Sequence, residues 1–482
     1  MKNRNRNKIE LYTFILFISL ITMCCSPADK KEFTDNKPYI LTPEPSQAPQ
    51  INGAKVFGVR PGNPIFFTVP ATGKRPMKFS AENLPKEVKL DEESGRLTGV
   101  IERPDSFNIV LRAENEFGMS ERNFRIVVGD KLALTPPMGW NSWNGWGYHV
   151  TAKQVKATAE AMVSTGLINH GWTYINIDVG WQGERGGKYN AIQPNEKFPD
   201  MKELCDYIHS LGLKIGIYST PWTRAYWGYT GGSSDDKNGV LPDIETGIEH
   251  GRGRYLGKYK FDKNDVQQWE EWGIDYIKYD WESPVDKEEN VNHAKILSEE
   301  LYQCNRDIVF SLCNLMSIDD ADKKIPHAQL WRTCNDIRDV WDRSTLEKDQ
   351  WAQGISNIWD THREWRSFTK PGNWADPDML ALGWVGFGDK ELHESRLTPD
   401  EQYTHVSLWC LFSAPLFIGS PVGKLDDFTL NLLSNDEVIE VNQDPLGRQA
   451  YMARQDNGGE IWIKRMEDGS KVVGIFNRTV LI

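Results

Sequence analysis

Residues 200–218 read DMKELCDYIHSLGLKIGIY and contain one predicted helix followed directly by one predicted strand. Asp200 is of the type that caps helix N-termini, and Gly212 is of the type that ends helices. Four apolar residues between them fall on one helical face: Met201, Leu204, Ile208 and Leu211. The runs 213–218 and 174–179 have the short apolar composition of strands. Strands that alternate with helices predict a parallel sheet.

The same alternation continues on both sides of this stretch. Thr151 can cap a helix that ends before Gly166, with Val155, Ala159 and Met162 as its apolar face. Further strands are predicted at residues 274–280, 308–313, 329–334, 373–380 and 411–418. We therefore predict the α/β class, with an eight-stranded (β/α)8 TIM barrel over residues 132–440.

The first 24 residues predict an export signal. Four basic residues (Lys2, Arg4, Arg6 and Lys8) precede an uncharged run, 11–23, that is too short for a membrane span of about 20 residues. Cys24-Cys25 resembles a bacterial lipoprotein cleavage site. We expect a lipoprotein acylated at Cys24, periplasmic or on the cell surface and anchored to the outer membrane by lipid alone. Acylation at Cys25 and an ordinary cleaved signal are the alternatives.

Two predicted modules precede the barrel. Residues 25–51 contain five prolines and no helical period, which indicates a linker. Residues 52–131 carry short alternating runs such as 65–69, 107–111 and 124–128, which predict an all-β sandwich. The segment 84–99 resembles immunoglobulin-like modules. We expect a spacer or docking module without catalytic residues.

Composition excludes several classes of function. The 482 residues carry 56 Lys and Arg against 68 Asp and Glu, a net charge of −12, so nucleic acid is not an expected partner. The five cysteines beyond the N-terminal pair and the nine His lack metal-ligand spacing, and we expect no metal and no cofactor. The sequence leaves undecided whether two of these five cysteines form a disulfide. Of the 19 Trp, 18 lie between Trp140 and Trp409. We therefore expect that any flat aromatic surface for a ligand is provided by the barrel.

Carboxylates end several of the predicted strands, where barrel enzymes place their functional groups. Lys278 and Asp280 share one face of their strand, and the ammonium group would keep the carboxylate ionised, as a nucleophile requires. Asp336 follows another strand, close to Arg332. Asp178 ends an earlier strand. Glycoside hydrolysis is indicated by two carboxylates with aromatic walls, in a sequence that has no phosphate-binding motif and no serine-nucleophile motif.

Seven motifs in order make residues 132–482 resemble glycoside hydrolase family 27, the α-galactosidase family. They are 137–143 (PMGWNSW), 177–178 (ID), 278–280 (KYD), 332–336 (RTCND), 374–379 (WADPDM), 414–416 (APL) and 442–447 (NQDPLG). The resemblance implies a retaining hydrolase with Asp280 as nucleophile and Asp336 as acid/base, about 5–5.5 Å apart. It also implies these sugar-binding residues: Trp143, Asp178, Tyr218, Lys278, Asn314, Arg332, Asp378 and Met379.

The departures from the family pattern concern specificity. Val179 replaces an Asp that grips the C4/C6 end of galactose, and Asn314 stands where a Glu reads the 2-hydroxyl. Trp281-Glu282 replace the usual Cys, and the loop 221–258, rich in Trp, Tyr and Gly, matches the family poorly. We expect an α-galactosidase. The alternatives are a β-L-arabinopyranosidase, an α-glucan hydrolase of the isomaltodextranase type and a non-catalytic carbohydrate-binding lipoprotein.

Since the family ends in an antiparallel β-domain, we expect residues 441–482 to form an incomplete β-domain. The oligomeric state is not predicted.

Overall fold

The computed structural model describes residues 39–241, 255–280, 287–313, 317–346, 351–388 and 391–478. Its central element is an eight-stranded parallel sheet in the order β20-β19-β18-β17-β14-β11-β10-β23. The strands are β10 (Met138–Asn141), β11 (Tyr174–Ile177), β14 (Lys214–Ser219), β17 (Tyr276–Asp280), β18 (Val309–Cys313), β19 (Leu330–Arg332), β20 (Trp374–Asp376) and β23 (Leu416–Ile418). A parallel bridge from Leu380, just after β20, to Ile418 joins the two sheet edges. This closure confirms the predicted TIM-like barrel.

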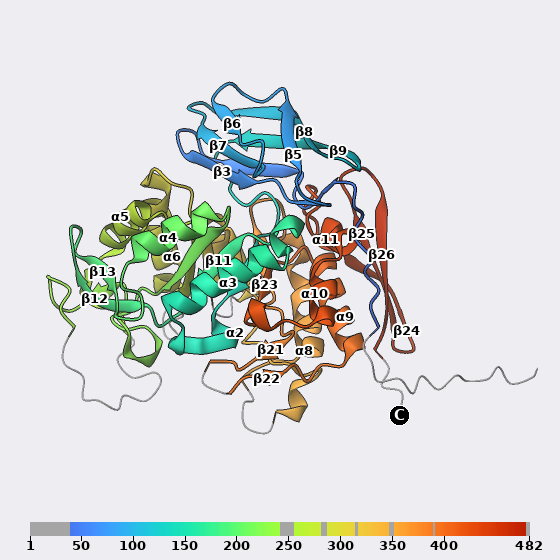
Figure 1. Ribbon diagram of the computed structural model, residues 1–482. Coiled ribbons are helices and arrows are strands. Elements are labelled where there is room, and N and C mark those ends of the chain that lie inside the picture. Colours follow the sequence, from blue (N-terminus) through green and yellow to red (C-terminus); the bar gives the residue numbers. More distant parts are fainter. Residues whose placement is uncertain are drawn as a thin grey trace, which may run out of the picture. The chain divides into compact units, whose positions relative to one another are not determined.

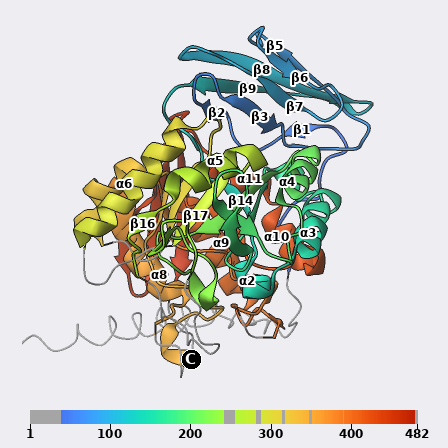
Figure 2. The same cartoon turned by 90° about the vertical axis from the view of Figure 1, so that its left-hand side faces the viewer.

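Helices lie outside the barrel strands (Figures 1 and 2). They are α2 (Trp143–Trp146), α3 (Ala152–Ser164), α4 (Met201–Ser210), α5 (Asp262–Trp272), α6 (Lys287–Gln303), α7 (Ala321–Lys324), α8 (Ile355–His362), α9 (Pro399–Leu411), α10 (Asp427–Leu433) and α11 (Asp436–Asn442). The two predicted caps are confirmed, because Thr151 accepts from the Gln154 N–H and Asp200 accepts from the Glu203 N–H. Three two-stranded sheets also occur: β12 (Gln182–Gly186) with β13 (Ala191–Pro194), β15 (Ser233–Ser234) with β16 (Tyr259–Lys260), and β21 (Trp384–Val385) with β22 (His393–Glu394).

Two details of the predicted barrel are wrong. The run 411–418 begins as helix, since Leu411 is the last residue of α9 and the strand β23 starts at Leu416. An unbroken apolar run does not distinguish a buried strand from a buried helix end. The strand β10 was not predicted, because its four residues, two of them Gly139 and Asn141, lack a strand-like composition.

β-Sheets precede and follow the barrel, as predicted. One N-terminal sheet has the order β2 (Val56–Val59), β9 (Gly118–Val128), β8 (Asp105–Asn115), β5 (Lys78–Glu82), and a second has the order β3 (Pro64–Thr68), β7 (Arg96–Val100), β6 (Val88–Leu90). β1 (Gln50–Ile51) pairs with β4 (Ala71–Thr72). Buried residues of both sheets share one apolar core. After the barrel, β24 (Tyr451–Asp456), β25 (Gly459–Arg465) and β26 (Lys471–Asn477) form an antiparallel sheet.

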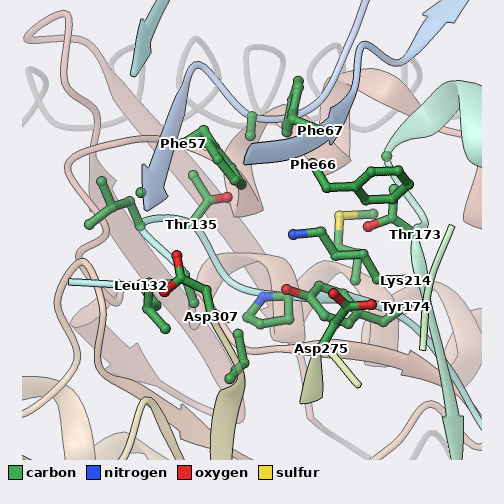
Figure 3. Close-up of a pocket in the computed structure, with 18 of the residues that line it drawn as sticks. Phe57, Phe66, Phe67, Leu132, Thr135, Thr173, Tyr174, Lys214, Asp275 and Asp307 are labelled. Carbon is green, nitrogen blue, oxygen red and sulfur yellow. The ribbon is translucent and has the colours of Figure 1, made fainter. Parts of the chain in front are cut away.

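The N-terminal sheets contact the end of the barrel at which the parallel strands begin. Arg60 Nε lies 2.6 Å from Asp307 Oδ1, and the Thr68 hydroxyl donates to the Gly212 carbonyl at 2.8 Å. A pocket lined by residues of both parts lies between them. In Figure 3, Lys214 extends its amino group between aromatic walls, 5.1 Å from the ring centre of Phe57 and 5.3 Å from that of Tyr174.

Tryptophan and cysteine mostly fill the interior. Nine Trp side chains are among the largest fully buried ones: Trp140, Trp172, Trp181, Trp269, Trp331, Trp359, Trp374, Trp409 and Trp462. The aromatic excess therefore packs helices against strands more than it lines a binding surface. Among the described residues no disulfide is formed, because the five cysteines there are free and buried: Cys205, Cys304, Cys313, Cys334 and Cys410. Within the described ranges, no helix has both the length and the hydropathy needed to cross a bilayer.

Candidate active site

A cavity opens at the carboxyl ends of the barrel strands. Because all eight strands are parallel, their last residues meet at this one end. The lining residues are Trp143, Asp178, Val179, Tyr218, Tyr226, Trp227, Lys278, Asp280, Cys313, Arg332, Asp336, Trp351 and Met379. The cavity thus combines three carboxylates, two cations and several aromatic rings, the composition of a carbohydrate site.

Asp280 is the last residue of β17 and is 5% exposed. The Tyr218 hydroxyl donates to its Oδ2 at 2.8 Å, whereas its buried Oδ1 has no hydrogen-bond partner among the described residues. Burial raises the pKa of this carboxyl to about 6, against the opposing effect of the Lys278 ammonium; the charges of Asp178 and Asp336 raise it further. One oxygen is therefore oriented by hydrogen bonding, and the other remains available to a reactant.

Lys278 connects two strand ends. Its Nζ lies 2.7 Å from Asp178 Oδ2, and both side chains are largely buried. Burial alone would lower the pKa of Lys278, but the Asp178 carboxylate raises it well above the ordinary value. Asp178 is itself fixed, because its N–H donates to the Ser142 hydroxyl and its Oδ1 accepts from the Val179 N–H. The pair therefore presents a fixed positive charge beside Asp280.

Arg332 holds the second candidate carboxylate. Its Nη2 lies 3.3 Å from Asp336 Oδ1 and 2.9 Å from Asp378 Oδ2. Asp378 has a φ of 80° and accepts from the Ile337 N–H, so it also fixes the backbone next to Asp336. The Asp336 side chain is 32% exposed, while Arg332 and Asp378 are 4% exposed. Asp336 is thus anchored on one side and reachable from solvent on the other.

An apolar wall completes the cavity. Val179 is buried with Tyr218 and Ala225, and partly buried aromatic side chains pack on them. The Trp143 and Trp227 rings lie 5.0 Å apart, and Tyr148 stacks on Trp227 at 4.9 Å. Position 179 therefore offers the cavity methyl groups and no hydrogen-bonding side chain.

The structure gathers most of the predicted site residues. Trp143, Asp178, Tyr218, Lys278, Asp280, Arg332, Asp336 and Met379 line the cavity, and Asp378 contacts it through Arg332. Asn314 and Cys24 lie outside the described residues. Sequence reasoning missed four lining residues: Tyr226, Trp227, Cys313 and Trp351. The aromatic composition of the loop 221–258 signalled the first two, and Cys313 ends the predicted strand 308–313, whereas nothing local to the sequence marks Trp351.

Comparisons with known proteins agree on one family. The family model described as alpha galactosidase A matches residues 135–251 and 235–444. The chain is 35% identical over 356 residues to "Alpha-galactosidase 2" of Arabidopsis thaliana, covering 73% of this chain and 78% of the relative. A crystal structure from Bacteroides fragilis NCTC 9343, described as an alpha-galactosidase by assignment only, is 35% identical, with a TM-score of 0.79 over 90% of this chain and 87% of the other.

A solved relative has a different sugar in its name. The GH27-β-L-arabinopyranosidase from Geobacillus stearothermophilus is 28% identical, with a TM-score of 0.58. The match covers 72% of this chain and 85% of that one. Most of this chain is thus similar in fold to proteins named for two sugars that differ at C6.

Proposed function

Because the chain belongs to the alpha galactosidase A family, glycoside hydrolase family 27, it is a glycoside hydrolase that releases terminal α-galactosyl residues, and we propose that it does so by double displacement on Asp280 and Asp336. One observation carries this proposal. A buried carboxylate with one free oxygen and a half-exposed carboxylate line the same cavity. Those are the surroundings that a nucleophile and an acid/base residue need.

In the first step, Asp280 attacks the anomeric carbon and the glycosidic C–O bond breaks. Asp336 gives its proton to the departing oxygen. In the second step, Asp336 takes a proton from water, the water oxygen bonds to the anomeric carbon, and the bond to Asp280 breaks. Lys278 and Asp178 face the sugar as a charged pair that can hydrogen-bond its hydroxyls, and Trp143 offers a ring to its C–H face.

The ionisation of Asp280 predicts the acidic limb of the pH profile. Below a pKa of about 6 the carboxyl is protonated and cannot attack, so kcat/KM should fall as the pH decreases through 6. The Lys278 charge lowers this pKa, so Lys278→Gln should move the limb to higher pH as well as reduce activity. Profiles of kcat/KM between pH 4 and 8 for both proteins test this, and an unmoved limb would assign it to another group.

A second activity is favoured by Val179. An apolar side chain cannot satisfy the 6-hydroxyl of galactose, and an unpaired buried hydroxyl costs about 1–3 kcal/mol. β-L-Arabinose has the galactose ring without C6, so we propose that β-L-arabinopyranosides are also hydrolysed. Hydrolysis of nitrophenyl α-galactoside, β-L-arabinopyranoside and α-glucoside, measured side by side, tests both activities; a protein inactive on the first would refute the proposed function.

Val179→Asp should restore an acceptor at this position. We expect the ratio of kcat/KM for the α-galactoside to that for the arabinopyranoside to rise about tenfold, which corresponds to about 1.4 kcal/mol. Val179→Ala is the matched control, since it enlarges the cavity without adding an oxygen. A ratio that rises equally in both variants would show that space, not hydrogen bonding, limits galactose.

We also propose that the protein is exported and anchored by an acylated Cys24, with the N-terminal sheets as an immunoglobulin-like docking module. The basic and apolar residues before Cys24 support export. The two N-terminal sheets with a common core support the module. Labelling of the full-length protein with palmitate, compared with Cys24→Ala and Cys25→Ala, tests the anchor; unchanged labelling of both variants would refute it.

A further inference from the structure

Trp351 differs from every other tryptophan that the structure describes. It is 52% exposed, whereas the others are buried or half-buried. It also lines the active-site cavity together with Asp336. A single exposed aromatic residue is ordinary on a protein surface, but this one lies at the mouth of a carbohydrate-cleaving cavity. Its uncovered ring is therefore available to a ligand.

The backbone fixes Trp351 relative to Asp336. The N–H of Gln353 donates to the Asp336 carbonyl at 2.9 Å, and the N–H of Arg338 donates to the Gln353 carbonyl at 2.8 Å. Ala352, which lies between Trp351 and Gln353, is fully buried. Directly afterwards α8 begins at Ile355, with the Gly354 N–H donating to Asn357 Oδ1 at 3.0 Å. The segment that carries the indole is thus joined at Gln353, two residues after Trp351, to the segment that carries the Asp336 carboxylate.

The two aromatic parts of the cavity lie beside different groups of the site. Trp143 and Trp227 pack on each other and belong to the apolar wall around Val179, which the proposed function assigns to the terminal sugar. Trp351 is tied instead to the residue that protonates the departing oxygen, so it lies toward the leaving group. Pyranose rings present C–H faces that pack on indole, whereas an alkyl chain has no flat face to match.

We propose that Trp351 is a platform on which the first pyranose of the leaving group stacks. This inference rests on the proposed function and adds to it a residue that determines which leaving groups are accepted. It makes Trp351 a specificity-determining residue with no part in bond cleavage. The loss of kcat/KM on removal of the Trp351 side chain must therefore depend on the leaving group.

The test compares two substrates with the same galactosyl group. Melibiose releases a sugar, and α-galactosyl fluoride releases fluoride, which needs no platform. In Trp351→Ala we expect kcat/KM for melibiose to fall about tenfold more than kcat/KM for the fluoride, mainly through KM. Trp351→Phe, which retains a flat ring, should recover most of the loss. Trp384→Ala is the matched control, since this half-buried Trp packs on Lys424 outside the cavity.

Equal losses on both substrates would overturn the platform, because they would mean that Trp351 acts by positioning Asp336. Unchanged hydrolysis of melibiose in Trp351→Ala would overturn it as well, while leaving the proposed function intact. A wild-type protein inactive on both substrates would refute the proposed function itself and the platform with it.

Discussion

Asp280→Asn should reduce kcat for nitrophenyl α-galactoside by at least about 10⁴-fold, because an amide cannot form the glycosyl ester. The protein should remain folded. The ionised Asp280 carboxylate is buried, and burial raises its pKa to about 6, so above that pH its charge opposes folding. An Asn of the same shape can still accept from the Tyr218 hydroxyl. Steady-state kinetics and thermal melting followed by circular dichroism measure the two effects.

Asp262→Asn is the matched control for this variant. Asp262 is also buried, and burial likewise raises its pKa to about 6, but it belongs to α5 and does not line the cavity. We expect its replacement to leave kcat nearly unchanged. Asp280→Gly with added azide gives a second readout, since azide can occupy the emptied space and should yield the β-galactosyl azide. Retained activity in Asp280→Asn would refute the assignment of the nucleophile.

Asp336→Ala should show a loss that depends on the leaving group. Protonation of the departing oxygen contributes about 10²–10⁴-fold, so melibiose hydrolysis should fall by that factor. An activated nitrophenolate departs without a proton, so the first step on a nitrophenyl galactoside should be affected much less. Azide should then attack the glycosyl-enzyme and yield the α-galactosyl azide, the opposite anomer from that of Asp280→Gly.

The anomer of the azide product thus shows independently whether each carboxylate is the nucleophile or the acid/base residue. Asp360→Ala is the control for Asp336, since Asp360 is a half-exposed carboxylate that pairs with Arg478 outside the cavity. Its kinetics should match those of the wild type on every leaving group. An Asp336→Ala variant with equal losses of kcat/KM on melibiose and the nitrophenyl galactoside would refute its role as the acid.

The sequence was sufficient for elements whose signals are local. Thr151 and Asp200 cap their helices through side-chain contacts three residues away, and such contacts are written into short stretches of sequence. Strand ends could be predicted as the site because parallel strands of a closed sheet all end on one side. This rule alone brought Asp178, Asp280 and Asp336 to one cavity from positions far apart in the chain.

What the sequence could not supply depends on contacts between distant segments. Trp351 reaches the cavity because Gln353 pairs with Asp336, and no local pattern encodes that pairing. Likewise, nothing in the composition distinguishes a Trp that fills the core, such as Trp331, from one that lines the site. Tyr226 and Trp227 came closest to prediction, because their loop is aromatic and matches the family poorly.

Burial raises the pKa of each of the five free cysteines (Cys205, Cys304, Cys313, Cys334 and Cys410) and keeps them as neutral thiols. The described fold therefore owes nothing to oxidation. Its stability does not depend on a disulfide bond among these five cysteines, so the described fold can form under reducing conditions. Reductant added during purification breaks no bond between these five cysteines, and thiol-directed reagents should react slowly with them in the native fold.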